Sequence, residues 1–250
     1  MAQLANKIAI ITGAGSGFGA GIAQAYVAEG AKVMLADINA DSVQRVAARL
    51  GAHAAAFTCD VSNGPQIRAL VEQCVTTFGA PDIVVNNAGI THRNGPLTDV
   101  DEATFDHVFA VNVKSIYHMA QALVPMMRQR RSGVILNIGS TAGIRPRSGL
   151  VWYNATKGAV NNISKSMAVE LAPDQIRVNA ICPVMGETGL LAQFMGVPDT
   201  PENRAKFLAT IPLGRFSQPR DIANVAVFLA SDAAEFLTGL EFPVDGGRTV

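Results

Sequence analysis

This sequence of 250 residues contains few cysteines and carries no formal net charge. The three cysteines, Cys59, Cys74 and Cys182, are widely spaced and include no Cys-x-x-Cys pair. Such spacing predicts neither a disulfide framework nor a zinc site and fits a reducing cytoplasm. Twenty Lys and Arg balance twenty Asp and Glu, so the formal net charge is zero. Binding to nucleic acid through its phosphates depends on a basic excess, so we expect no nucleic-acid partner.

Long apolar runs are missing as well. Gly, Pro or charged residues interrupt every apolar stretch before it reaches the roughly 18 residues of a membrane span, so we expect no membrane partner. The first apolar run, Ile8 to Ile11, is too short for the core of an export signal, which favours a cytoplasmic location. With 49% apolar and 16% charged residues, the chain can build one large core, and residues 1–250 are expected to form a single domain.

Short apolar runs alternate along the chain with longer segments of helical spacing, which indicates a parallel sheet covered by helices on both faces. The runs lack polar alternation, as is typical of strands buried on both sides. Strands are predicted at Lys7–Ile11, Lys32–Asp37, Ala54–Thr58, Ile83–Asn86, Gly133–Ile138, Ile176–Ile181 and Glu241–Val244. Helices are predicted at Phe18–Glu29, Ala40–Leu50, Pro65–Phe78, Ala103–Arg131, Trp152–Leu171 and Arg220–Ala230. Residues 184–216 interrupt this alternation and are expected to form an inserted loop or a small helical flap.

A glycine-rich turn joins the first predicted strand to the first predicted helix. It reads Thr12-Gly13-Ala14-Gly15-Ser16-Gly17-Phe18-Gly19. Glycine lets the backbone turn sharply and approach a pyrophosphate, and the free N–H groups at the start of a helix bind such an anion. We therefore expect a dinucleotide here, with an ordinary tight turn as the alternative.

Asp37 ends the second predicted strand, eighteen residues after Gly19. A carboxylate at this place can accept hydrogen bonds from the adenosine ribose hydroxyls, and it would repel a 2′-phosphate. Ala14, Ile38 and Asn39 do not supply the Lys or Arg that a 2′-phosphate requires. The sequence therefore favours NAD over NADP, unless Asp37 only caps the next turn.

The spacing Gly-x-x-x-Gly-x-Gly from Gly13, together with Tyr153-Asn154-Ala155-Thr156-Lys157, resembles the single-domain short-chain dehydrogenase/reductase family. The resemblance extends over essentially the whole chain through Asp60-Val61, Asn86-Asn87-Ala88-Gly89 and Val244-Asp245-Gly246-Gly247. It implies a Rossmann-like, doubly wound parallel sheet of seven strands and a homotetramer. The cofactor contacts that follow from the resemblance and the turn are Gly13, Ser16, Gly17, Phe18, Gly19, Asp37, Ile38, Asp60, Val61, Asn87, Ala88, Gly89, Tyr153, Lys157, Pro183, Gly186 and Thr188.

The same resemblance implies a catalytic tetrad of Asn112, Ser140, Tyr153 and Lys157. Tyr153 and Lys157 are four residues apart on a predicted helix, so their side chains lie on one face. A nearby ammonium and a positive nicotinamide ring both favour the phenolate, so Tyr153 can act as general acid/base. Ser140 can hold the substrate oxygen. By analogy with the family, Asn112 positions a water in a proton relay to Lys157.

One family motif is changed after the sixth strand, where Val184 follows Pro183 in place of the usual glycine. A β-branched residue requires a negative φ, so we expect Gly186 to take over the turn. Thr188 keeps the position from which it can reach the nicotinamide carboxamide. His92, just after the Asn-Asn-Ala-Gly motif, is expected in a surface loop.

Two groups of residues near the expected cleft remain open to interpretation. Arg145 and Arg147 could meet a carboxylate or phosphate on the substrate, or could be solvated. The flap contributes apolar residues that could cover the substrate or form a subunit contact, namely Leu190, Leu191, Phe194, Met195 and Phe207.

The favoured function is an NAD(H)-dependent oxidoreductase that transfers hydride between nicotinamide and a small-molecule substrate, either a secondary alcohol, polyol or sugar or the corresponding ketone. A reductase of 3-oxoacyl thioesters on acyl carrier protein is the alternative enzyme, although its usual NADPH preference conflicts with Asp37. A protein that senses dinucleotide without turnover is a third hypothesis, which the complete tetrad disfavours.

Overall fold

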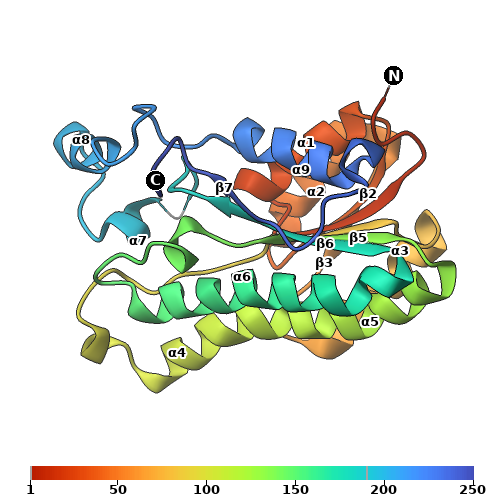
Figure 1. The fold of residues 1–250 in the computed structure, drawn as a ribbon, viewed down its shortest axis with the longest axis horizontal. Coiled ribbons are helices and arrows are strands. Elements are labelled where there is room, and N and C mark those ends of the chain that lie inside the picture. Colours follow the sequence, from red (N-terminus) through yellow and green to blue (C-terminus); the bar gives the residue numbers. More distant parts are fainter. Residues whose placement is uncertain (1, 190) are drawn as a thin grey trace.

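The computed structural model describes residues 2–189 and 191–250, and over these ranges the strands form one parallel sheet (Figure 1). Its seven strands lie in the order β3-β2-β1-β4-β5-β6-β7. Their bounds are β1 Ile8–Thr12, β2 Lys32–Asp37, β3 Ala54–Thr58, β4 Ile83–Asn86, β5 Gly133–Ile138, β6 Ile176–Pro183 and β7 Glu241–Val244. The predicted fold class is confirmed, and the predicted strands differ from the observed ones by at most two residues at either end.

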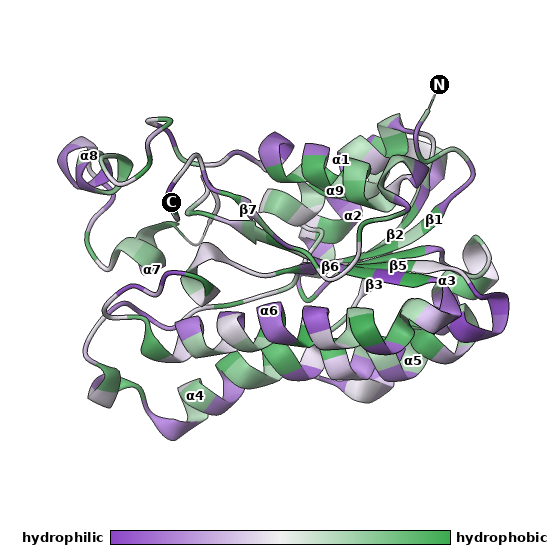
Figure 2. Ribbon diagram, viewed as in Figure 1, coloured by the Kyte–Doolittle hydropathy of each residue, from purple (hydrophilic) through white to green (hydrophobic). Residues whose placement is uncertain are grey.

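Helices pack on both faces of this sheet (Figure 1). One face is covered by α1 Gly17–Ala28, α2 Ala40–Leu50 and α9 Pro219–Ala230. The other face is covered by α3 Gly64–Thr77, α5 Ser115–Arg130 and α6 Val151–Leu171. The strands between the two layers are strongly hydrophobic, whereas the helices alternate hydrophobic and hydrophilic residues (Figure 2).

Strand β1 illustrates why the sequence of these strands shows no polar alternation. Ala9 and Ile11 pack into the core on the α1 side, whereas Ile10 packs into the core on the α3 side. All three side chains are fully buried. Since successive side chains of a strand point to opposite faces and both faces are covered, every position in the strand favours an apolar residue.

The chain order reverses between β1 and β4, which lie side by side in the sheet. At such a reversal the loops leave neighbouring strands in opposite directions and open a crevice at the carboxyl ends of the strands. The Thr12 hydroxyl holds this crevice in shape, because it accepts hydrogen bonds of 3.0 Å from the amides of Asn87 and Ala88.

The single helix predicted at Ala103–Arg131 is interrupted in the structure. α4 covers Glu102–Phe109, and a π-helical turn at Ala110–Lys114 separates it from α5. The Ser115 hydroxyl donates a 2.6 Å hydrogen bond to the carbonyl of Val111 inside this turn. Such π-turns insert one residue into a helix and are frequent at functional sites, and this one contains Asn112.

The described part of the flap, residues 184–189 and 191–216, contains two short helices, α7 Leu191–Met195 and α8 Pro201–Leu208. Leu190, one of the expected cover residues, lies outside the described residues. A small apolar cluster stabilises the segment, formed by Val184, Leu191, Met195, Ile211 and Phe216. In the described part of the chain, none of the helices combines the length and apolar character needed to cross a membrane.

Candidate active site

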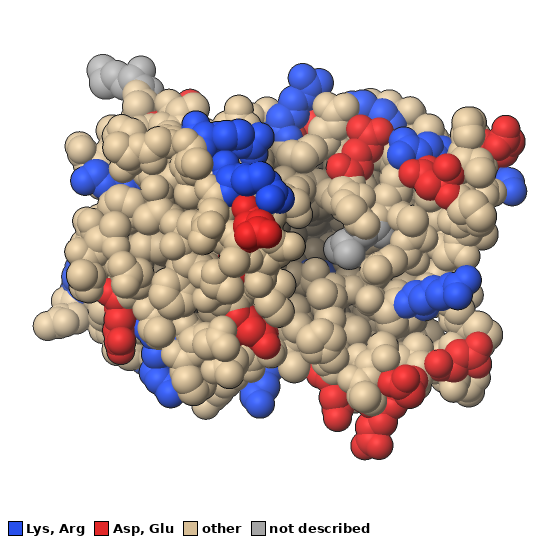
Figure 3. Space-filling model, turned by 180° about the vertical axis from the view of Figure 1, so that it is seen from behind, with Lys and Arg blue, Asp and Glu red and all other residues tan. Residues whose placement is uncertain are grey.

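A cavity of about 590 Å³ lies at the carboxyl ends of the strands. This volume is in the range of small-molecule and cofactor sites. The face in Figure 3 is hollowed near its centre, and charged residues of both signs are scattered around the hollow. Every predicted site residue except Gly19 and Asn112 lines the cavity, namely Gly13, Ser16, Gly17, Phe18, Asp37, Ile38, Asp60, Val61, Asn87, Ala88, Gly89, Ser140, Tyr153, Lys157, Pro183, Gly186 and Thr188.

The glycine turn forms one wall of the cavity. Gly13 and Gly17 have φ angles of +63° and +53°, a backbone conformation that side chains with a Cβ rarely adopt. Helix α1 begins at Gly17, and the side chain of the preceding Ser16 makes no capping hydrogen bond. The Ser16 side chain thus leaves the first amides of α1 uncapped, and Gly17 and Phe18 at this helix start line the cavity, which suits the binding of a pyrophosphate group.

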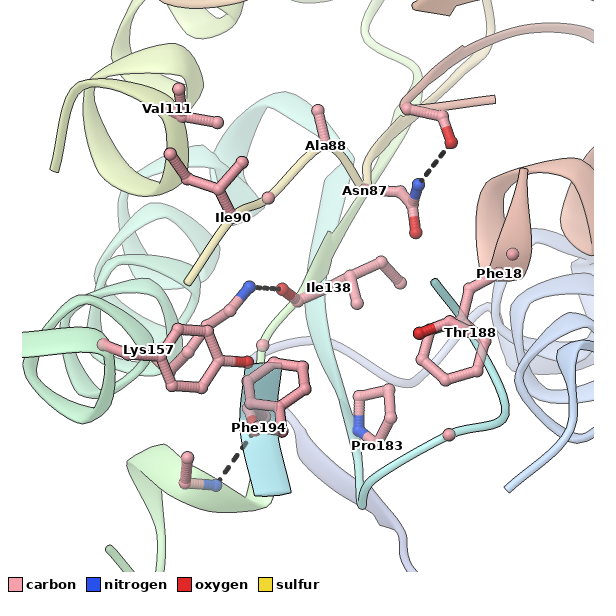
Figure 4. Close-up of a pocket in the computed structure, with 18 of the residues that line it drawn as sticks. Phe18, Asn87, Ala88, Ile90, Val111, Ile138, Lys157, Pro183, Thr188 and Phe194 are labelled. Carbon is pink, nitrogen blue, oxygen red and sulfur yellow. Dashed lines mark hydrogen bonds between the residues drawn. The ribbon is translucent and has the colours of Figure 1, made fainter. Parts of the chain in front are cut away.

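Gly19 contributes to the turn through close packing. A Cβ at this position would lie 2.2 Å from the carbonyl oxygen of Gly13 and 2.5 Å from Nδ2 of Asn87. The same Asn87 nitrogen donates hydrogen bonds to the carbonyls of Thr12 and Gly13, at 2.8 and 3.1 Å, and one of these bonds is drawn in Figure 4. Gly19 thus lets α1 approach the turn, and its predicted contact with the cofactor stays a prediction.

We expect Gly19→Ala to destabilise the protein by about 1–3 kcal/mol, the usual cost of forcing extra atoms into a packed site. The backbone carbonyl of Gly13 must move to make room, so cofactor affinity should fall as well. Chemical denaturation and titration with NADH would measure the two effects. Gly158→Ala is the control, since a Cβ at this helical glycine meets no atom of the described residues within 4 Å. Equal behaviour of the two variants would contradict the prediction.

Asp37 lines the cavity and is held by the backbone on both sides. Its Oδ2 accepts a 2.9 Å hydrogen bond from the amide of Gly15, and its Oδ1 accepts a 3.0 Å hydrogen bond from the amide of Asn39. Both interpretations from the sequence thus have a structural counterpart, because the carboxylate supports the next turn and also faces the cavity. The adjacent Ile38 is 69% exposed.

Tyr153, Lys157 and Ser140 lie together at the other end of the cavity. The Lys157 ammonium donates a 2.8 Å hydrogen bond to the carbonyl of Ile138 (Figure 4) and lies 5.9 Å from the centre of the Tyr153 ring. Ser140, just past the end of β5, is within hydrogen-bonding reach of the Tyr153 hydroxyl. The Ser140 oxygen also accepts a hydrogen bond from the amide of Ala142, which fixes its position.

Burial changes the acidity of both titrating groups in opposite directions. It raises the pKa of Tyr153 to about 12, although the hydrogen bond from Ser140 and the charge of Arg147 act against this rise. It lowers the pKa of Lys157 to about 8. Each shift disfavours the charged form, so further positive charge near Tyr153 would help it to lose its proton.

Lys157→Met is expected to raise the melting temperature at pH 7, although Lys157 is a predicted catalytic residue. The folded protein binds this proton less tightly than the unfolded chain does, so the wild type gains stability as pH rises from about 8 to 10.5. The difference in melting temperature between the variant and the wild type should therefore be largest below pH 8 and should shrink above it. Thermal melts across pH 6–10 would test this. The melting temperature should differ by about 2–4 °C for each kcal/mol of difference in the free energy of unfolding.

Lys165→Met, on the same helix, is the matched control for that experiment because Lys165 is half exposed and paired with Glu241. A difference in melting temperature between Lys157→Met and wild type that stays constant with pH would contradict the assignment of the lowered pKa to Lys157.

Asn112 is buried but does not line the cavity. Its Oδ1 accepts a 2.8 Å hydrogen bond from the amide of Ile90, and its Nδ2 donates to the carbonyl of Ile90 and to the hydroxyl of Thr156, at 2.9 and 3.0 Å. The side chain thereby joins the loop after β4 to α6. Its predicted role in a proton relay to Lys157 stays a prediction.

The prediction that Gly186 takes over a turn is wrong. Neither Val184 nor Gly186 has a positive φ. Glycine is favoured at 186 for lack of space, since a Cβ would lie 2.3 Å from Cζ of Phe18. Gly186 also pairs with Ser217 in an isolated β-bridge, which directs the loop past the cavity.

Near the site, the structure contradicts one prediction made from the sequence and adds a residue that the sequence did not indicate. His92 lies in a loop, but the prediction of a surface position is wrong, since the residue is only 4% exposed. Its Nδ1 lies 2.9 Å from the carbonyl of Arg93. Arg248 lines the cavity, and its only sequence signal is its place just after the Val-Asp-Gly-Gly motif. The three cysteines are buried and free, and burial raises the pKa of Cys182 to about 12.

The chain is similar to known proteins over nearly its whole length. A family model described as enoyl-(acyl carrier protein) reductase matches residues 13–249. A 4-formylbenzenesulfonate dehydrogenase of Comamonas testosteroni is 48% identical, covering 99% of this chain and 100% of its own length. A 2-(S)-hydroxypropyl-CoM dehydrogenase of Xanthobacter autotrophicus is 41% identical, covering 99% and 98%.

Among solved structures, the crystal structure of a 3-ketoacyl-(acyl-carrier-protein) reductase from Brucella melitensis complexed with NADH superposes with a TM-score of 0.94. It is 43% identical, covering 99% of this chain and 100% of that one. From this likeness in sequence and fold, and from the residues gathered at the cavity, the chain belongs to the short-chain dehydrogenase/reductase family and is an oxidoreductase.

Proposed function

We propose that the protein is an NAD(H)-dependent oxidoreductase acting on a secondary alcohol, polyol or sugar and the corresponding ketone. The observation that carries this proposal is the placement of Tyr153, Ser140 and Lys157 in the same cavity as the glycine turn and Asp37. The NADH complex of the Brucella reductase supports a nicotinamide cofactor.

In this proposal each end of the cavity has a separate task. The amides at the start of α1 bind the pyrophosphate, and the Asp37 carboxylate accepts hydrogen bonds from the adenosine ribose. The bound nicotinamide supplies the acceptor or donor of hydride. Ser140 holds the substrate oxygen. Tyr153 takes the hydroxyl proton during oxidation and returns it to the carbonyl oxygen during reduction, while the Lys157 ammonium favours the phenolate.

A 3-oxoacyl-thioester reductase is the second candidate function, and the name of the Brucella neighbour supports it. The 48% identical relative is named for an aromatic aldehyde, 4-formylbenzenesulfonate, which supports a small substrate free of carrier protein. A homotetramer stays an expectation from the family resemblance, and a cytoplasmic location stays an expectation from the cysteine spacing and the short first apolar run.

The test is to follow the absorbance of NADH and NADPH separately with ketones, sugars and an acetoacetyl thioester. We expect NADH to be oxidised with a ketone or sugar and preferred over NADPH. Preference for NADPH by an order of magnitude would contradict the role of Asp37, and preference for the thioester would favour the second candidate. Tight NADH binding without turnover of any compound would favour a sensor.

A further inference from the structure

Three arginines, Arg145, Arg147 and Arg248, line the cavity near Tyr153. Within the described ranges none of them forms an ion pair, although other arginines such as Arg128 and Arg204 do. Positive charge therefore accumulates beside the reacting groups of a chain whose formal net charge is zero.

The acidic residues of the same cavity lie too far along the sheet to neutralise this charge. Asp37 ends β2 and Asp60 follows β3, whereas Ser140 follows β5 and Tyr153 belongs to α6. In the sheet, β1 and β4 separate β2 from β5. The cavity thus has acidic groups at one end and arginines at the end where the reaction is proposed to occur.

Arg147 is half-buried and held in one orientation by its neighbours. Its Nη2 donates a 2.8 Å hydrogen bond to the carbonyl of Phe194, and its Nη1 lies 3.2 Å from the sulfur of Met185. The guanidinium carbon lies 5.2 Å from the centre of the Phe207 ring, as in a cation–π contact. These contacts use only part of the five N–H donors of the group.

The backbone of Arg147 is also held by helix α6, which carries Tyr153. Nδ2 of Asn154, the residue after Tyr153, donates a 2.7 Å hydrogen bond to the Arg147 carbonyl. The Phe194 ring in turn packs edge-on against the Tyr153 ring, with 5.0 Å between their centres. Arg147 is therefore placed at a defined position relative to the Tyr153 hydroxyl.

This arrangement costs free energy in the absence of an anion. Burial and the charge of Arg248 both lower the pKa of Arg147, which means that both disfavour its charged form. Arg145 adds to the cluster by donating a 3.1 Å hydrogen bond to the Arg248 carbonyl. Arg147 and Arg248 are half-buried, whereas Arg145 is exposed. Half-buried like charges are destabilising, and an anion bound between them removes the penalty.

We propose that Arg147, assisted by Arg145 and Arg248, binds a carboxylate or sulfonate carried by the substrate at the end remote from its reacting carbon. The inference rests on the proposed function and defines its substrate class as alcohols and ketones with a negative charge. The planar guanidinium fork matches such oxyanions through two parallel hydrogen bonds. The rings of Phe194 and Phe207 suit a flat apolar group between the two ends of the substrate.

Matched ketones test this inference. We would measure kcat/KM with NADH for 4-acetylbenzoate and for its uncharged methyl ester, using the wild type and Arg147→Met. We expect the wild type to prefer the anion, and Arg147→Met to lower the ratio of the two kcat/KM values by about 100-fold, mainly through KM. Arg49→Met removes the same charge from the exposed surface of α2, outside the cavity, and should leave the ratio unchanged.

An unchanged ratio in Arg147→Met, or a wild type that prefers the ester, would overturn the inference. A rise in KM for NADH in place of the ketone would also overturn it, because the arginines would then serve the cofactor.

A binding measurement separates failure of this inference from failure of the proposed function. Calorimetry with Tyr153→Phe loaded with NADH would compare 4-acetylbenzoate with its ester without turnover. Preferential binding of the anion, lost when Arg147→Met is added, supports the inference even if the wild type reduces neither ketone. Equal binding of the two compounds would overturn it, whatever the activity.

Discussion

Tyr153→Phe is expected to lower kcat in both reaction directions by about 10³-fold, within the range that a positioned general acid/base contributes. The substitution removes only the hydroxyl group, and the remaining ring keeps its edge-on contact with Phe194. Folding and NADH affinity should therefore change little. Steady-state rates and an NADH titration of the same preparation would measure both properties.

The pH dependence gives a second signature of the same group. Because the neutral phenol is the acid and the phenolate the base, alcohol oxidation should accelerate as pH rises toward the Tyr153 pKa, and ketone reduction should slow. Burial places that pKa at about 12 in the protein alone. Tyr117→Phe, which alters an exposed tyrosine on α5, is the matched control. Full activity in Tyr153→Phe would remove the proposed acid/base from the reaction.

Replacing Asp37 with Ala and Ile38 with Arg together should change the ratio of kcat/KM for NADPH and NADH by about 100-fold or more in favour of NADPH. The first substitution removes the carboxylate that repels a 2′-phosphate, and the second supplies the guanidinium that binds one. Ile38 is largely exposed, so an arginine can replace it without disturbing the core.

One single variant separates the two contributions to this change, and a second serves as the control. Ile38→Arg alone should give a smaller change, because Asp37 still accepts its hydrogen bonds and repels the phosphate. Asp41→Ala removes an acid of the same charge from the first turn of α2 and should leave the ratio as in wild type. If the double variant keeps the original preference, Asp37 does not determine it.

Much of the site could be predicted from the sequence because its parts depend on local chain geometry. The glycine turn requires positive φ at Gly13 and Gly17, which glycine tolerates and other residues rarely adopt. Tyr153 and Lys157 share a face because a helix places residues four apart on one side. Asp37 reaches the cavity because a parallel strand ends at the edge of the sheet where ligands bind.

The predictions about Gly186 and His92 were wrong because close packing and burial in three dimensions do not follow from the local sequence. Glycine is favoured at 186 by the ring of Phe18, which belongs to α1 and lies far away in sequence. His92 is buried by its surroundings, and its own neighbours in the sequence do not reveal this. Likewise Asn112 matches the family tetrad, but only the structure shows that its amide binds Ile90 and Thr156.

The sequence by itself determined the parallel sheet, the family and many residues of the cavity, because apolar periodicity, glycine conformation and helical spacing are properties of neighbouring residues. Only the tertiary structure decided how those residues act on one another. Burial moves the pKa values of Tyr153 and Lys157 in opposite directions, and packing places Arg248 beside Arg147 although about a hundred residues separate them. Desolvation and charge repulsion depend on distance in space, which local patterns in the sequence do not encode.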